Sequence, residues 1–196
     1  GRVASGEHPG RPLYDTLRPE TLRAGLYHAD GQQLDEVYAY GSFRQSKMYS
    51  RGVRCTDCHN PHSGETKAKG NAVCTQCHRP EGNPRFPTLV RKAYDAPSHH
   101  FHKTGSPGGQ CVNCHMPTKD YMIVHPRPDH SLRPPRPDLS VKIGTPNACT
   151  GCHRNRTAEW AAAAVVKWYG PTRPMGWDWA LAVAAGRAGA RDGAPA

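Results

Sequence analysis

All eight cysteines of this 196-residue chain fall into four copies of one pentapeptide, C-x-x-C-H. The copies begin at residues 55, 74, 111 and 149, and no cysteine lies outside them. Each copy places two thiols one short turn apart and sets an imidazole directly beside the second thiol. A fold that keeps these three groups together in four places must build its interior around whatever they bind.

Three chemistries use cysteines at such short spacing. Zinc would take the thiols as two all-cysteine sites, but zinc does not explain why a histidine follows the second cysteine each time. A disulfide inside each motif would close only a tiny loop and stabilise little. Covalent haem explains the whole pattern, because the two thiols add to the vinyl groups and the histidine binds the iron. The sequence thus predicts four haem c groups, attached through Cys55, Cys58, Cys74, Cys77, Cys111, Cys114, Cys149 and Cys152, with proximal iron ligands His59, His78, His115 and His153.

The composition favours a fold built on the haems. Hydrophobic residues make up only 36% of the chain, which also has 20 Gly and 19 Pro. A chain of this composition would struggle to close a core on its own. We therefore expect a mostly irregular, loop-rich multihaem fold with a few short α-helices, the haems as its core, and little or no β-sheet.

The spacing of the motifs suggests three regions within a single compact unit. Residues 1–54 precede every motif and are expected to form a haem-free wrapping arm, with a short helix near residues 19–24. Residues 55–155 would be the tetrahaem core. Residues 156–196 would form C-terminal helices and a tail, with one helix over residues 157–169, capped by Thr157 and stopped by Gly170-Pro171, and a second over about residues 177–188.

The formal net charge of +10 is not a nucleic-acid signal. Four haems bring two propionates each, about −8 in total, and each oxidised iron returns about +1, so many basic residues are expected to partner propionates. No DNA-binding motif or stripe of basic and aromatic residues is present, which argues against nucleic acid. No apolar run approaches the roughly 20 residues of a membrane-spanning helix.

The chain is expected to be exported. It opens Gly1-Arg2-Val3 without an initiator methionine, as a processed product would. Haem is attached to C-x-x-C-H outside the cytoplasmic membrane of bacteria and archaea, so we expect a periplasmic or extracellular protein.

Each iron has a sixth position, and eight histidines remain to fill the four. His62 follows a proximal ligand by three residues and is expected to serve a neighbouring haem. One of His99, His100 and His102 should be a ligand, with His102 preferred and His99 next. His130 is preferred to His125, and His28 is expected to be a ligand as well.

Two residues have alternative interpretations. Met48 precedes Cys55 by seven residues and could give one haem a His/Met pair with a raised potential, although packing is its commoner use. His8 lies on the haem-free arm, where it is either free or able to reach a haem of another subunit.

The sequence also resembles a known family along almost its whole length. Segments 27–32, 36–43, 45–49 and 52–62, together with Cys114-His-Met-Pro, Asp129-His-Ser-Leu-Arg and the run 137–149, are similar to multihaem cytochromes c that are often fused to a tetratricopeptide-type helical region. Family members usually carry further haem motifs before the position of Gly1 and helical repeats beyond Ala196, so this chain resembles their central tetrahaem segment. The resemblance implies electron transfer and export.

Three classes of function remain for such a chain. The first is an electron carrier with closely stacked, mainly bis-histidine low-spin haems, which exchanges electrons with redox proteins or with identical subunits. It could polymerise into an extracellular filament, with His8 or His28 acting as a ligand in trans. The second is a reductase of nitrite or hydroxylamine with one open iron, against which the spare histidines argue. The third is a structural docking module.

Overall fold

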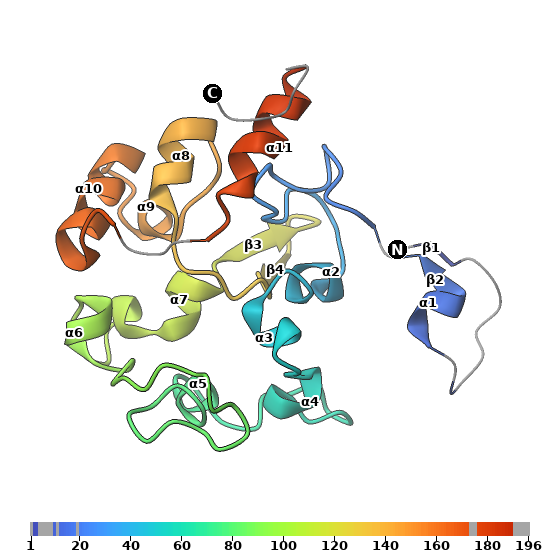
Figure 1. Cartoon of the computed structure of the whole chain (residues 1–196), viewed down its shortest axis with the longest axis horizontal. Coiled ribbons are helices and arrows are strands. Elements are labelled where there is room, and N and C mark those ends of the chain that lie inside the picture. Colours follow the sequence, from blue (N-terminus) through green and yellow to red (C-terminus); the bar gives the residue numbers. More distant parts are fainter. Residues whose placement is uncertain (1, 4–9, 11, 19, 173–175, 190–196) are drawn as a thin grey trace.

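The computed structural model describes residues 2–3, 10, 12–18, 20–172 and 176–189, and within these ranges the helices are short (Figure 1). The two longest are α10 (Ala158–Tyr169) and α11 (Trp179–Arg187). The others are α1 (Leu13–Thr16), α2 (Ala39–Phe43), α3 (Lys47–Ser50), α4 (Cys55–Cys58), α5 (Ala72–Thr75), α6 (Pro97–His100), α7 (Cys111–His115), α8 (Pro137–Ile143) and α9 (Ala148–Cys152), with a 3₁₀ turn η1 over Pro107–Gly109.

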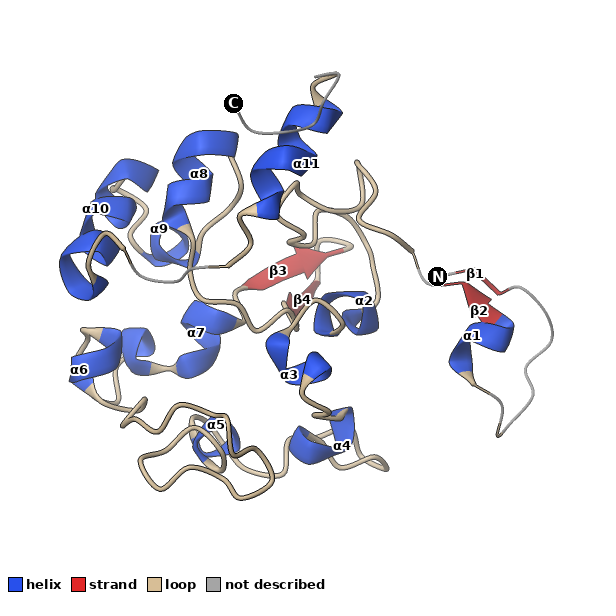
Figure 2. Ribbon diagram, viewed as in Figure 1, coloured by secondary structure: helices blue, strands red, loops and turns tan. Residues whose placement is uncertain are grey.

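Four short strands form two separate antiparallel pairs (Figure 2). One joins β1 (Arg2–Val3) to β2 (Leu17–Arg18), and the other joins β3 (Thr118–Tyr121) to β4 (His125–Pro128). The prolines of β4 are tolerated because each strand has only one neighbour. Neither pair grows into a larger sheet in the described part of the chain.

Every haem motif begins on a short helical segment, namely α4, α5, α7 and α9 in chain order. Side chains three residues apart on a helix lie on one side, so α4, α7 and α9 point both thiols of their motifs the same way, whereas α5 ends before Cys77. Local hydrogen bonds start two of these turns. The Asp57 carboxylate accepts from the backbone N–H of Arg54 at 2.7 Å, and the Asn147 side chain accepts from the N–H of Thr150 at 3.0 Å.

The C-terminal helices follow the sequence expectation. Thr157 caps α10, with its hydroxyl accepting from the N–H of Trp160, and the helix ends at Tyr169 before Gly170. The second expected helix is observed as α11, two residues shorter at its start than expected. Trp177 has a left-handed backbone conformation, with φ of 62°, which holds it outside the helix.

The short helix expected near residues 19–24 is not observed, and that expectation is wrong over the described residues 20–24. This stretch makes isolated turns instead, and Gly25 continues it with φ of 84°, a left-handed conformation that a right-handed helix cannot contain. The nearest helix is the single turn α1, which ends before this stretch.

A small apolar core lies behind the haem motifs, where α8 meets α10 and α11. Leu139, Trp177 and Ala180 form its buried cluster, and Ile143 and Leu181 pack against it. Ala161 and Val165 bury the inner face of α10. In Figure 1 these helices occupy one half of the body, whereas α4, α5 and α6 lie in the other half with α7 between them.

The segment before the first motif is bound to the body by long-range hydrogen bonds. Gln33 accepts from the Tyr121 hydroxyl on β3 at 2.7 Å, and Gln32 donates to the carbonyl of Pro146 at 2.7 Å. Arg187 on α11 donates to the carbonyl of Tyr27 at 2.9 Å. None of the helices in the described ranges is both long and apolar enough to cross a membrane.

The cap of α10 gives a first prediction. Thr157→Ala removes the hydroxyl that accepts from the N–H of Trp160, so it should lower the free energy of unfolding by about 1 kcal/mol, within the usual range of roughly 0.5–2 kcal/mol for such caps. Thermal unfolding of the haem-loaded protein measures the change. Thr172→Ala, at an exposed turn position after the helix, is the matched control and should leave stability nearly unchanged; equal losses in both variants would contradict the capping role.

Candidate functional site

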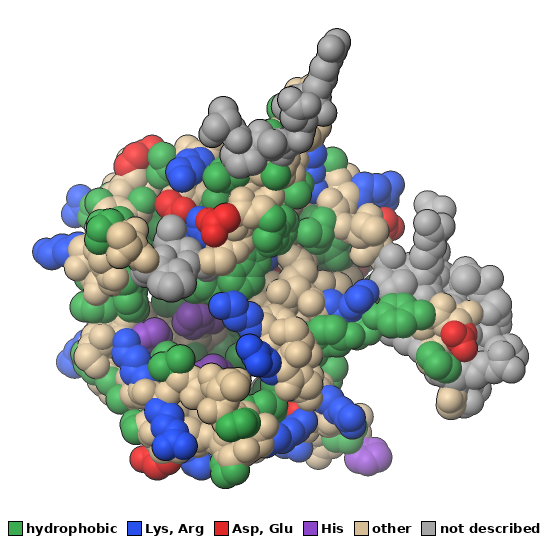
Figure 3. Space-filling model, in the orientation of Figure 1, with side chains coloured by type: hydrophobic (Ala, Val, Ile, Leu, Met, Phe, Trp, Pro, Cys, Tyr) green, Lys and Arg blue, Asp and Glu red, His purple; other side chains and the backbone are tan. Residues whose placement is uncertain are grey.

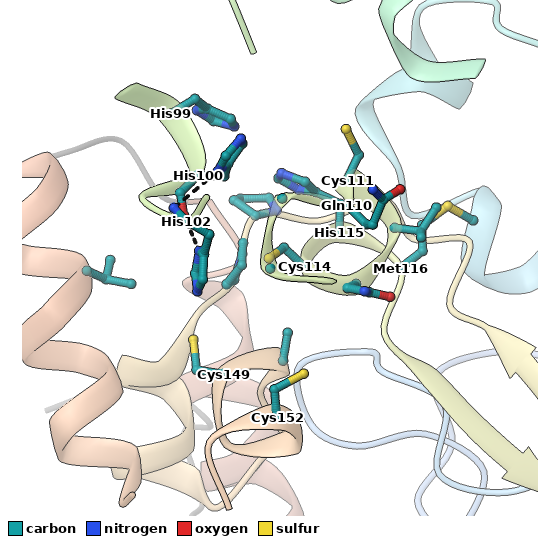
Figure 4. Close-up of a pocket in the computed structure, with 18 of the residues that line it drawn as sticks. His99, His100, His102, Gln110, Cys111, Cys114, His115, Met116, Cys149 and Cys152 are labelled. Atoms are coloured by element: carbon teal, nitrogen blue, oxygen red, sulfur yellow. Dashed lines mark hydrogen bonds between the residues drawn. The ribbon is translucent and has the colours of Figure 1, made fainter. Parts of the chain in front are cut away.

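Three of the four motifs line one large cavity. It has a volume of about 520 Å³ and takes its walls from α5, α6, α7, α9 and α10 and from the loop that follows α6. Thiols and imidazoles of the second, third and fourth motifs face it, together with His99, His100 and His102. Figure 4 shows these three histidines on one side of the cavity, across from His115, with the thiols of the fourth motif below. In Figure 3 histidines are visible inside a hollow with Lys and Arg side chains around it.

Three motif histidines each face a second histidine at nearly one spacing. The ring centres are 6.3 Å apart for His59 and His130, 6.2 Å for His115 and His99, and 6.1 Å for His153 and His102. Each pair joins one motif histidine to one histidine from outside the motifs. The ring planes are parallel within 2° in the second pair and tilted by 31° and 35° in the first and third.

This spacing is close to the one that a metal ion shared by two imidazoles would give. An imidazole–metal bond is roughly 2.0–2.1 Å long and a ring centre lies about 1.15 Å from its nitrogen, so two imidazoles on opposite sides of one ion have centres about 6.3–6.5 Å apart. Direct stacking would bring the rings much closer. His100 and His102 are also 6.5 Å apart, but they are two residues apart in the chain and neither belongs to a motif.

Hydrogen bonds orient most of these rings for metal binding through Nε2. Four of the six paired histidines bond through Nδ1 to a backbone carbonyl, which can only accept, so Nδ1 carries the proton and the Nε2 lone pair stays available. The four bonds run from His59 to Gly64, from His102 to His100, from His115 to Arg133 and from His130 to Pro128.

His100 has the opposite arrangement. The backbone N–H of His102 donates to its Nδ1 at 3.2 Å, so the neutral ring carries its proton on Nε2. That Nε2 is buried and has no hydrogen-bond partner. In this arrangement His100 offers an N–H donor toward the cavity.

Burial in the cavity favours the neutral form of two of its imidazoles, those of His99 and His115. Burial lowers the pKa of His99 to about 4, with smaller effects of Lys92 and the neighbouring histidines. Burial also lowers the pKa of His115, although its bond to the Arg133 carbonyl acts in the other direction. Neutral imidazole is the form that binds a metal ion. These rings are therefore ready to bind iron without first losing a proton.

The second motif differs from the other three. Burial, and then the proximity of His115, lower the pKa of His78, but no second imidazole faces its ring among the described residues. Its ring neighbour is Tyr94, whose ring meets it edge to face with centres 5.5 Å apart. Tyr94 also meets His99 edge to face, with ring centres 5.0 Å apart. Its ring therefore contacts both His78 of the second motif and His99, which faces His115 of the third motif.

The thiols show that consecutive motifs are spatial neighbours. Burial raises the pKa of Cys58, and Asp57 and Cys77 of the second motif raise it further. A hydrogen bond with Cys111 of the third motif, followed by burial, raises the pKa of Cys74. Burial raises the pKa of Cys114 to about 11, with further contributions from both thiols of the fourth motif. The order of the motifs along the chain is thus also their order in space.

The other candidate residues lie outside these pairs. His28 is half-buried, and burial is the main cause that lowers its pKa. His62 and His125 are exposed, and neither faces another imidazole ring in the described part of the chain. Met48 lines the cavity that also holds Cys74 and His78. His8 lies outside the described residues.

The residues present fit haem. All eight cysteines are free thiols, which thioether attachment requires. The facing imidazoles leave room for a metal ion between them. Two buried donors without partners, Nε2 of His100 and Nη2 of Arg133, suit the propionates that haem carries. Within the described ranges, no group of three or more His, Cys, Asp and Glu side chains is placed to hold a metal ion.

Sequence reasoning missed several residues around this site. Arg133 positions a proximal imidazole through its backbone carbonyl, for which the sequence holds no signal. Tyr94 and the α10 residues Trp160 and Trp168 contact ligand rings, and only the helical periodicity of α10 would have placed the last two on one side.

Comparison with known proteins agrees with the interpretation of the C-x-x-C-H motifs as haem attachment sites. Residues 48–83, which contain the first two motifs, match a family described as "Doubled CXXCH motif". No curated protein and no solved structure matches the chain. The family match supports a multihaem c-type cytochrome that binds haem c covalently and functions in electron transfer. Cytochromes of this type are typically exported.

The imidazole pairs generate a second prediction. In His130→Ala the first motif would lose its facing imidazole, so about one haem in four should change from low-spin to high-spin. Electron paramagnetic resonance of the oxidised protein measures this change. His125→Ala, five residues earlier on the same segment and exposed, is the matched control and should keep the wild-type spectrum; the reverse result would assign the ligand to His125.

Proposed function

We propose that this chain is a tetrahaem electron carrier whose first, third and fourth haems are each held between two imidazoles. The proposal rests on the three imidazole pairs with centres 6.1–6.3 Å apart. The ligand pairs are His59 with His130, His115 with His99, and His153 with His102. Haem iron, when bound, supplies a one-electron change between its ferric and ferrous forms, and iron with both axial positions filled has no place for substrate.

The arrangement of the thiols supports transfer along the chain of motifs. Because Cys74 lies in hydrogen-bonding contact with Cys111, the second and third motifs offer neighbouring attachment points. The first and second motifs, and the third and fourth, are also close enough for their thiols to shift one another's pKa. We propose that electrons pass through the motifs in sequence order.

The sixth ligand of the second haem would come from outside the three pairs. Met48 lines the same cavity as His78, and His28 and His62 are not used by the other motifs. We propose that a histidine from a second copy of the chain, with His8 and His28 as the first candidates, completes this haem and joins subunits into an extracellular or periplasmic polymer. Both residues precede the first motif and so belong to the haem-free segment of the chain.

A second function is favoured by one observation only. The absence of a facing imidazole at His78 in the described residues is the feature that a reductase of nitrite or hydroxylamine would need. Tyr94, which contacts His78, would be its nearest candidate for an acid group. The two functions differ in whether that iron binds a small external ligand.

Three measurements test the carrier proposal together. Mass spectrometry should show four haems on each chain, and the ferrous protein should bind no carbon monoxide at concentrations where the chains associate. Electron micrographs of the same sample report polymerisation. Carbon monoxide binding by one haem in four with turnover of nitrite would support the reductase instead, and fewer than four haems would contradict both.

Dilution distinguishes a sixth ligand supplied by a second copy of the chain from one supplied by the same chain. If a second copy supplies it, about one haem in four should begin to bind carbon monoxide as the protein is diluted, because the ligand in trans is lost by mass action. Met48→Ala is the companion variant. It should leave this behaviour unchanged, whereas carbon monoxide binding that appears at every concentration in Met48→Ala would assign the ligand to the thioether.

A further inference from the structure

The segment of residues 128–133, here called the 128–133 strap, holds an imidazole at two different haem sites. The Nδ1 of His130 donates to the carbonyl of Pro128 at 2.9 Å, and the Nδ1 of His115 donates to the carbonyl of Arg133 at 2.9 Å. His130 faces His59 of the first motif, and His115 belongs to the third. A single short segment therefore fixes rings at two irons that are not consecutive along the chain.

Buried charged side chains anchor this strap. Arg133 is only 4% exposed, and its guanidinium forms an ion pair with Asp30 at 3.2 Å while also donating to the Asp30 carbonyl at 2.8 Å. Its Nε donates to the Ser131 hydroxyl at 2.8 Å and lies 4.0 Å from the Asp129 carboxylate. Asp129 in turn accepts from the backbone N–H of Ser131 at 2.8 Å.

The cluster of Asp30, Asp129 and Arg133 carries two carboxylates against one guanidinium. Asp30 is 1% exposed and Asp129 is 5% exposed, so neither charge is screened well by solvent or salt. The neutral Gln32 side chain completes the shell by donating to Asp30 at 2.7 Å. The cluster therefore holds one uncompensated negative charge behind the axial rings of two haem sites.

We propose that this cluster is a shared redox-tuning device that lowers the reduction potentials of the first and third haems together. Oxidation adds a positive charge at an iron, and a buried negative charge near its ligand stabilises that form. The three residues act through His115 and His130, so they are positioning residues. The inference rests on the proposed function, because it uses the ligand pairs assigned there.

Asp129→Asn is the sharpest test in the four-haem protein. The Asp129 Oδ2 atom has no hydrogen-bond partner, so an amide in its place removes the charge without breaking a hydrogen bond. The ferric-to-ferrous ratio of the first and third haems at a fixed potential should shift toward ferrous by about tenfold, which is 59 mV for one electron. The second and fourth haems should shift much less.

Asp35→Asn is the matched control, since it removes the same charge from an exposed position five residues after Asp30. Potentiometric titrations followed by electron paramagnetic resonance single out the third haem, because its ring planes are parallel within 2° whereas the other two pairs are tilted. Haem-methyl resonances in nuclear magnetic resonance spectra follow the remaining haems. Asp129→Glu keeps the charge and should restore the wild-type potentials.

The outcomes separate the two proposals. Equal shifts in Asp129→Asn and Asp35→Asn, or an equal shift at all four haems, would overturn the tuning device while leaving the ligand pairs intact. Wild-type spectra without bis-histidine low-spin haems would instead overturn the proposed function. If Asp129→Asn fails to bind four haems, Asp30→Asn provides the same comparison with the same expected direction.

Discussion

If the proposed haems are bound, the fold depends on the gap between paired imidazoles. Only nine hydrophobic residues are buried among those that the structure describes, and their largest cluster joins three residues of α8, α11 and the segment before α11. That is too little apolar burial for a chain of 196 residues to close on itself. Three motif histidines instead lie with their ring centres 6.1–6.3 Å from a second histidine, a spacing at which each pair could share one group. Haem in these gaps would supply the missing apolar contact, which makes folding and cofactor attachment one process.

Shared side chains and segments connect the proposed haem sites. Tyr94 contacts rings of the second and third sites, the 128–133 strap reaches the first and third, and α10 places Trp160 against His153 and Trp168 against His102. Tyr169 of the same helix also meets His99, with ring centres 6.2 Å apart, so each site shares an element with another site. A change in the charge of one iron would be felt through these shared elements, because buried charges in low dielectric interact over longer distances than exposed ones.

The sequence predicted those parts of the site that depend on residues close together in the chain. The motifs fixed the attachment cysteines and proximal histidines as candidates, and the cap and stop signals around α10 predicted that helix correctly. The distal partners depend on tertiary structure. His99 and His102 face different motifs because Phe101 between them has a left-handed backbone, with φ of 54°, and stacks on Trp168 with centres 4.7 Å apart. A bulky residue in that conformation has no sequence signal. The sequence therefore predicted one ligand from this segment where the structure pairs two.

The second motif differs from the other three in having no facing histidine among the described residues. Three motifs find a facing histidine within the described chain, so their irons would be closed before any partner arrives. His78 has burial and an aromatic neighbour but no second imidazole there. A site completed by a neighbouring subunit would bind that subunit through a coordinate bond, and the strength of this bond would add to whatever surface the two copies bury. This coordinate bond between subunits would also place the second haem directly on the path of electron transfer from one subunit to the next. Assembly and conduction would then depend on the same ligand, which is why the identity of that sixth ligand decides between a carrier that acts singly, a polymer and a reductase.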